Sequence, residues 1–145
     1  KLPAHGGRAI QAFFALVATE CAAAKGKPEL EKIASALEAA LGDLQAATMW
    51  LMANAMTNPD NAGAGSVAYM HLTGVVAIGL MWLRMATAAQ AALDAGTEDS
   101  AFMNAKLITA RFYAERSLPE TISLRRKLEA GAESVMALPV EAFAA

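Results

Sequence analysis

Several residue types are scarce in this sequence, and each shortage excludes a class of protein. The chain has one cysteine, Cys21, which excludes an internal disulfide or a metal site with several thiolate ligands and is typical of the cytoplasm. Aromatic residues make up 6% of the chain and charged residues 18%. Twelve Lys and Arg stand against fourteen Asp and Glu, so the net charge of -2 offers no basic field and argues against nucleic acid as a partner.

The residues that are abundant are apolar and small. Hydrophobic residues occupy 56% of the 145 positions, and 36 of the residues are alanine. This composition is too apolar for a disordered chain, and it favours helices packed through small side chains over sheets of β-branched and aromatic residues. The length is that of one ordinary domain. We therefore expect a single all-α domain over residues 1–145.

Three clusters of helix-breaking residues divide the chain into four segments; they lie at residues 25–28, 58–65 and 95–97. Within each segment apolar residues recur every three or four positions, as they do on one face of a helix. Helices are predicted at roughly residues 7–25, 28–57, 66–95 and 98–129. Four helices of this length joined by short loops predict an up-down four-helix bundle.

The ends of these helices carry their own signals. Gly26 is predicted to cap the first helix, and Pro28 suits the first position of the second helix, where no N–H is needed. Pro119 lies inside the last helix and removes one backbone hydrogen bond, which predicts a kink near Leu118. A short C-terminal tail follows Gly131.

Two features near the third segment allow both a functional and a structural interpretation. Residues 63–68 match the letters of a dinucleotide-binding turn, but no strand precedes them, so we expect a flexible loop. Residues 61–83 contain no charged residue over 23 positions, which is long enough for a membrane span. We expect a buried helix of the bundle instead. A face docked on another domain or on a membrane surface is the alternative, and a true span is a third.

No set of residues in the sequence has the pattern of a catalytic or metal-binding site. His5 and His71 are the only histidines, and neither has the glutamate spacing of a carboxylate-bridged di-iron bundle. Cys21 lies on the apolar face of the first helix without a histidine nearby in sequence, which is typical of a small core residue. We therefore predict no catalytic, cofactor-binding or metal-binding residue in this chain.

Five residues are candidates for a structural or inter-domain role: Trp82, Arg84, Lys106, Arg111 and Glu115. The three cations stand among apolar neighbours, so each is expected to pair with a carboxylate from the last helix or from an adjoining domain. Arg111 and Glu115 also have the i,i+4 spacing of a pair within one helix. Trp82 is expected to pack in the core or against another domain.

Four ordered strings carry a resemblance to a known family. They are Gly-Leu-Met-Trp-Leu-Arg-Met-Ala at 79–86, Ala-Lys-Leu-Ile-Thr-Ala-Arg-Phe-Tyr-Ala-Glu-Arg at 105–116, Leu-Pro-Glu-Thr at 118–121 and Met-Ala-Leu-Pro-Val-Glu-Ala-Phe at 136–143. They resemble the C-terminal helical extension of a bacterial acyl-CoA dehydrogenase subfamily similar to 3-methylmercaptopropionyl-CoA dehydrogenase. The opening Lys1-Leu2-Pro3, together with Gly6-Gly7, resembles the joint that follows the catalytic body in that subfamily.

The resemblance implies a parent flavoenzyme of fatty acid metabolism. In such an enzyme a glutamate base removes the α-proton of an acyl-CoA, and the β-hydride passes to N5 of FAD to give a trans-2-enoyl-CoA. The base lies in a Tyr-Glu-Gly-Thr-like segment upstream of the matched part, and this chain contains no such segment; Glu115 and Glu120 match the extension rather than the base. The implied FAD is therefore bound by the parent enzyme and not by this fragment.

The resemblance and the apolar third segment together predict a packing role. Residues 61–83 supply more apolar surface than one small bundle covers. The bundle is expected to dock on the rest of the dehydrogenase chain or on a second protomer, in a cytoplasmic homo-oligomer, and to help shape the entrance for the acyl-CoA substrate. Association with a membrane surface and a free-standing module that binds a partner helix are the alternatives.

Overall fold

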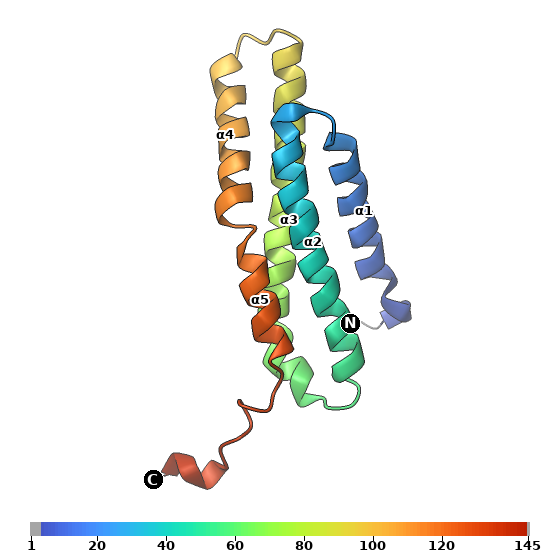
Figure 1. The fold of residues 1–145 in the computed structure, drawn as a ribbon, viewed down its shortest axis with the longest axis vertical. Helices are drawn as coiled ribbons and strands as arrows, with labels where there is room; N and C mark the ends of the chain where they lie inside the picture. Colours follow the sequence, from blue (N-terminus) through green and yellow to red (C-terminus); the bar gives the residue numbers. More distant parts are fainter. Residues whose placement is uncertain (1–3, 145) are drawn as a thin grey trace.

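The chain folds into an up-down bundle of helices (Figure 1). The computed structural model describes residues 4–144, and no strand occurs within that range. Its elements are η1 (Ala4–Gly7), α1 (Arg8–Ala24), α2 (Pro28–Asn54), α3 (Asp60–Asp94), α4 (Ser100–Arg116), α5 (Glu120–Glu129) and η2 (Val140–Ala144). The predicted all-α bundle is confirmed, with α4 and α5 together forming its fourth helix. Of the predicted joint, Lys1-Leu2-Pro3 lies outside the described residues, whereas Gly6 and Gly7 belong to η1.

The loop between α1 and α2 follows directly from the local sequence. Lys25 donates its backbone N–H to Cys21 O at 3.2 Å, and Gly26 then adopts a φ of 91°, which residues other than glycine rarely reach. Pro28 begins α2 at the first helical position. The predicted cap and the predicted helix start are therefore both confirmed.

The start of α3 differs from the prediction. α3 begins at Asp60, and residues 63–68 are helical, so the flexible loop predicted for them is wrong. Asn58 Oδ1 accepts a hydrogen bond from the backbone N–H of Asp60 at 3.1 Å, which stabilises the turn before the helix. Gly65 serves close packing, because a Cβ there would lie 3.1 Å from Cγ of Leu128.

The break between α4 and α5 lies at the proline where the sequence predicts a kink. Ser117 and Leu118 both donate their backbone N–H groups to Tyr113 O, at 2.9 and 3.1 Å, and close the last turn of α4. Pro119 has no N–H to donate, and α5 begins at the next residue. Leu118 is 2% exposed and anchors the break in the core. The kink is therefore confirmed.

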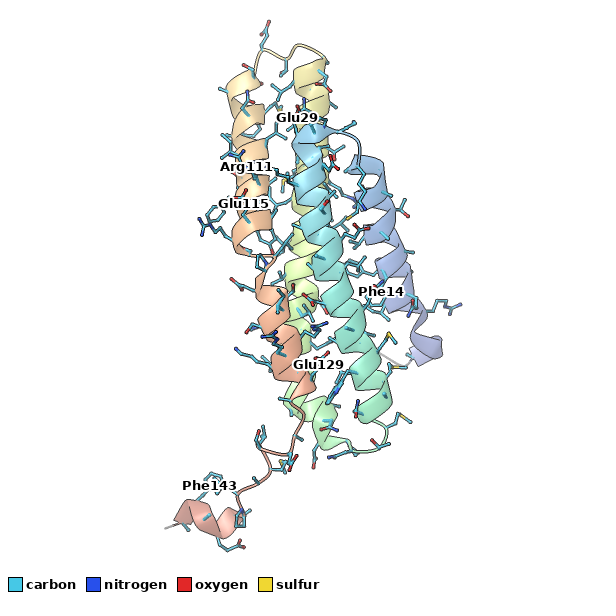
Figure 2. All side chains as sticks on the ribbon, viewed as in Figure 1. Phe14, Glu29, Arg111, Glu115, Glu129 and Phe143 are labelled. Atoms are coloured by element: carbon cyan, nitrogen blue, oxygen red, sulfur yellow. The ribbon has the colours of Figure 1, made fainter. Side chains whose placement is uncertain are left out.

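Leucine side chains fill the centre of the bundle. α2 and α3 form this centre, with α1 on one side and α4 and α5 on the other (Figure 1). The fully buried leucines are Leu30, Leu37, Leu44, Leu72, Leu80, Leu83 and Leu128. Phe14 of α1 belongs to the same core (Figure 2). Because α3 has neighbours on three sides, one face of it is left outside this core.

Candidate interaction surface

Arg84, one of the predicted ion-pair residues, is paired across two helices. Its Nη2 and Nε atoms donate to Oε1 of Glu20 on α1, at 2.6 and 2.9 Å. An ion pair is therefore found, and its partner within the described chain is on α1 rather than on the last helix; a partner on an adjoining domain stays a prediction. Arg84 lies on the flank of α3 beside α1, so α1 supplies the carboxylate. Both side chains are partly exposed, which limits what the pair adds to stability.

The two other predicted cations make no ion pair within the described part of the chain. Lys106 Nζ lies 4.8 Å from the centroid of the Phe102 ring, one turn earlier on α4. Arg111 and Glu115 are exposed on α4 and are not paired with each other, so the predicted i,i+4 pair is wrong (Figure 2). Solvated side chains gain little from such a pair. Lys106 thus remains available to a carboxylate from outside the bundle.

Half-buried aromatic side chains pack against the core from α3 and α4. Trp82 packs against the core from α3, which is one of the two roles predicted for it. Tyr113 of α4 donates its hydroxyl to Val75 O at 3.0 Å. Gly79 of α3 lies near Tyr113, and a Cβ at Gly79 would approach Leu118 and Leu37 to 2.9 Å. Glycine at this position therefore sets the distance between α3 and its neighbours.

A polar contact that the sequence analysis missed ties α5 to α2. Thr121 Oγ1 donates to Asp43 Oδ2 at 2.7 Å, and Arg125 Nε lies 3.4 Å from Asp43 Oδ1 and 3.8 Å from Glu129 Oε1. The Arg125 Nε atom is buried without a well-aligned hydrogen bond, so its contact with Asp43 is electrostatic. The signal in the sequence that could have predicted this contact is Asp43, a single carboxylate near the apolar face of α2. This cluster has a structural role.

Cys21 is fully buried in α1, and the prediction of a small core residue is confirmed. Burial, followed by the negative charge of Glu38, raises the pKa of its thiol from 9.0 to about 11. The thiol is therefore neutral near physiological pH, which makes it a poor nucleophile.

We expect this raised pKa to make the chain less stable in alkaline solution. The folded state favours the neutral thiol, so the contribution is complete below pH 9.0 and is lost as the pH rises toward about 11. Urea denaturation should give a lower midpoint at about pH 10 than at about pH 8, with a smaller decrease in Cys21→Ala. Burial also raises the pKa of Tyr69 and Tyr113. The wild type and Cys21→Ala both retain these tyrosines, so their contribution to the decrease is the same in each. An equal decrease in both chains contradicts the assignment to Cys21.

The outer face of α3 is apolar and uncovered along most of the helix. Five large side chains on it are exposed: Val67 60%, Met70 61%, Ile78 51%, Met81 44% and Met85 38%. Gly74 lies among them, and a Cβ there would meet nothing within 4 Å. We call these six residues the α3 stripe. The burial predicted for this helix thus holds only for the faces turned toward its neighbours.

α3 is also long and apolar enough to cross a membrane by length and composition. Its most apolar 18-residue window has a mean hydropathy of 1.6, and 28% of that window is buried inside the bundle. Core helices of soluble proteins pass the same test.

A hollow of about 220 Å³ continues the α3 stripe toward the end of the helix. It is lined by Met85, Ala88, Ala89, Phe102, Met103 and Lys106. The lining is apolar except for the Lys106 ammonium. An apolar side chain with a carboxylate beside it suits such a hollow, because the carboxylate can pair with Lys106.

Two further elements expose large apolar side chains. Phe102, Ile108 and Phe112 on α4 are 57%, 60% and 60% exposed. The C-terminal tail leaves the bundle, and its Phe143 is 74% exposed (Figure 2). Monomeric soluble proteins rarely expose so many apolar side chains on neighbouring elements unless a partner covers them. The exposed apolar side chains of α3, α4 and the tail are therefore the candidate interaction surfaces of the bundle.

Within residues 4–144, the hollows that the structure describes do not present a site for a flavin or a metal ion. Across residues 4–144, no three His, Cys, Asp or Glu side chains gather as a metal site needs. Hollows of about 170 and 330 Å³ lie at the seam of α2 and α5 and beside the start of α3. Each has a single carboxylate, Asp43 or Asp60, in a mainly apolar lining. Neither presents the glycine-rich turn that binds a pyrophosphate.

Comparisons with known proteins agree with the resemblance carried by the four strings. A family model described as acetyl-CoA dehydrogenase C-terminal like matches residues 10–139. Over 121 residues, the chain is 36% identical to a 3-methylmercaptopropionyl-CoA dehydrogenase of Ruegeria pomeroyi. Over 121 residues it is also 35% identical to the broad-specificity linear acyl-CoA dehydrogenase FadE5 of Mycobacterium tuberculosis.

The matched regions make up most of this chain but a small part of each relative. They cover 83% and 81% of this chain, but 20% of each relative, so the chain spans about a fifth of their length. The family match extends over most of the chain and includes α2, α3, α4 and α5 in full. The chain therefore belongs to the family of acetyl-CoA dehydrogenase C-terminal-like domains.

Proposed function

We propose that this chain is the C-terminal packing domain of an FAD-dependent acyl-CoA dehydrogenase, an enzyme that oxidises an acyl-CoA to a trans-2-enoyl-CoA. Both relatives are named as acyl-CoA dehydrogenases, and each extends well beyond the matched region. In this proposal FAD, the catalytic base and the acyl-CoA are held by the preceding part of the enzyme. The enzyme works in the cytoplasm as an oligomer, which suits a chain whose one cysteine is a buried free thiol.

The observation that carries this proposal is apolar surface left uncovered on several elements at once. The α3 stripe, the outer residues of α4 and the C-terminal tail all expose large apolar side chains. Removing such surface from water is favourable in proportion to its area, so a larger neighbour that covers it gains stability. This exposed surface supports a role of the bundle in holding the enzyme together and in shaping the boundary of its substrate entrance.

Removal of residues 1–145 from the complete enzyme tests the packing role. We expect the shortened enzyme to retain flavin but to unfold at a lower temperature or to lose subunit association, because its contacts with the bundle are gone. Calorimetry measures the unfolding temperature, sedimentation measures the assembly, and flavin absorbance measures cofactor content. Unchanged stability and assembly contradict the packing role.

Flavin titration of the separate 145-residue chain tests where the cofactor is held. We expect no specific quenching of FAD fluorescence, because the three hollows described for residues 4–144 are small and mainly apolar. The complete enzyme serves as the positive control. Stoichiometric FAD binding by the chain alone contradicts the proposed division of labour.

A further inference from the structure

The α3 stripe has a two-fold symmetric pattern centred on Gly74. Large apolar side chains lie four residues from Gly74 on both sides, at Met70 and Ile78, and seven residues away on both sides, at Val67 and Met81. All four are exposed. Because steps of four and seven residues return to one face of a helix, these side chains share the face of Gly74.

The symmetric pattern continues toward both ends of α3. Gly63 and Met85 lie eleven residues from Gly74, and Asp60 and Ala88 lie fourteen residues from it, and all four are exposed. If two copies of α3 lie antiparallel with Gly74 at the crossing, Met85 of one copy faces Gly63 of the other, and Ala88 faces Asp60. The pattern extends over about 42 Å of helix, at 1.5 Å per residue.

Gly74 suits the centre of such a crossing. A Cβ at this position would meet nothing within 4 Å, so no contact inside the bundle requires a glycine. Glycine in the interior of a helix is destabilising relative to alanine. The close approach of a second helix accounts for its presence, because small residues allow two backbones to cross at short range.

The charges at the ends of the pattern are complementary under the same symmetry. Asp60 and Lys106 make no ion pair within residues 4–144. Lys106 lines the hollow that Ala88 also lines. Because Ala88 faces Asp60 of the second copy, the antiparallel arrangement brings this carboxylate close to the Lys106 ammonium. The two-fold axis forms the contact twice.

We infer that the α3 stripe is an interface between two copies of this chain, which pair antiparallel about a two-fold axis at Gly74. A two-fold interface uses the same patch on both subunits and therefore needs the self-complementary spacing that the stripe has. A membrane surface requires no such symmetry, and it favours a helix face with a basic border. The border of the α3 stripe is mixed in charge, because the acidic Asp60 and Glu20 lie there together with Lys106 and Arg84. The inference rests on the proposed packing role and names the partner of one of its surfaces.

A matched pair of substitutions tests the interface. Gly74→Glu places a charge at the axis, and Gly42→Glu places the same charge at a glycine in α2 whose Cβ would also meet nothing within 4 Å. In sedimentation equilibrium of the 145-residue chain, we expect a dimer for the wild type and for Gly42→Glu. Gly74→Glu should raise the dissociation constant about a hundredfold or more, because two glutamates face each other. A monomeric wild-type chain, or equal effects of the two substitutions, overturns the inference.

Charge reversal tests the predicted orientation. Asp60→Lys should weaken the dimer about tenfold, since it places two cations together at each end of the interface. The double variant Asp60→Lys, Lys106→Asp should restore the dissociation constant toward that of the wild type. A dimer that responds to Gly74→Glu but is not restored by the reversed pair contradicts the antiparallel arrangement.

A cysteine at the axis and a lipid control complete the test. In a Cys21→Ala chain, Gly74→Cys should form a disulfide-linked dimer under mild oxidation, and Gly42→Cys should remain uncrosslinked. Flotation with phosphatidylcholine–phosphatidylglycerol vesicles by a chain that is monomeric in solution assigns the stripe to a membrane and overturns the inference. Such a result leaves the proposed function standing if removal of residues 1–145 still destabilises the complete enzyme.

Discussion

Replacing Leu128 with alanine should lower the free energy of unfolding by about 3–5 kcal/mol. Leu128 is fully buried, and among the described residues of α5 it is the one buried apolar side chain. It packs over Gly65 of α3, where a Cβ would lie 3.1 Å from its Cγ. Alanine leaves a cavity that Gly65 has no side chain to fill. The midpoint of urea denaturation, followed by circular dichroism, measures the loss.

The control for this prediction removes the same atoms from an exposed leucine. Leu138 lies in the C-terminal tail and is 61% exposed, so Leu138→Ala should change the free energy of unfolding by about 0.5 kcal/mol or less. Gly65→Ala tests the fit directly. It should destabilise the wild type, where the new Cβ presses on Leu128, but stabilise the Leu128→Ala chain by filling part of the cavity. Additive effects of the two substitutions contradict the fit.

The helices that the sequence predicted well are those whose signals are local. α2 begins at Pro28, as predicted, because proline at the first helical position needs no N–H partner. The break at Pro119 follows from the same missing N–H inside a helix. The apolar spacing of α2 places Leu37 and Leu44 in the core, since positions seven residues apart share one face.

The features that the sequence did not predict depend on partners far along the chain. The residues around Gly65 have the composition of a loop, yet they are helical and pack against Leu128. Arg84 pairs with Glu20, 64 positions away, and no spacing rule connects them. The contact between Thr121 and Asp43 spans 78 positions. Such pairs are fixed by how the helices pack, and local propensity does not specify that packing.

The exposed face of α3 shows both what the sequence predicts and where it stops. The excess of apolar surface was visible in residues 61–83, but these residues are apolar on nearly every side. The face that stays uncovered is decided by the positions of α1, α2, α4 and α5. Once that face is known, the symmetric spacing about Gly74 can be read from the sequence itself.

Replacing Gly79 with alanine should lower the free energy of unfolding by about 1–3 kcal/mol, although alanine is the better helix former. A Cβ at Gly79 would lie 2.9 Å from Cδ2 of Leu118 and 2.9 Å from Cδ1 of Leu37. Both leucines are buried, at 2% and 0% exposure, so neither can turn into solvent to make room. α3 must therefore move away from α2 and from the break between α4 and α5, which loosens the packing on two sides at once.

Gly42→Ala provides the opposite expectation in the same fold. A Cβ there would meet nothing within 4 Å, so only the helix propensity changes, and we expect a gain of about 0.5–1 kcal/mol. Thermal and urea denaturation of both variants measure the sign of the change in the free energy of unfolding for each substitution. The contrast isolates packing, because the chemical change and the helix-interior position are the same in each. If both substitutions stabilise the chain, the bundle accommodates a side chain at Gly79, and the close approach of α3 to Leu37 and Leu118 is not what requires a glycine there.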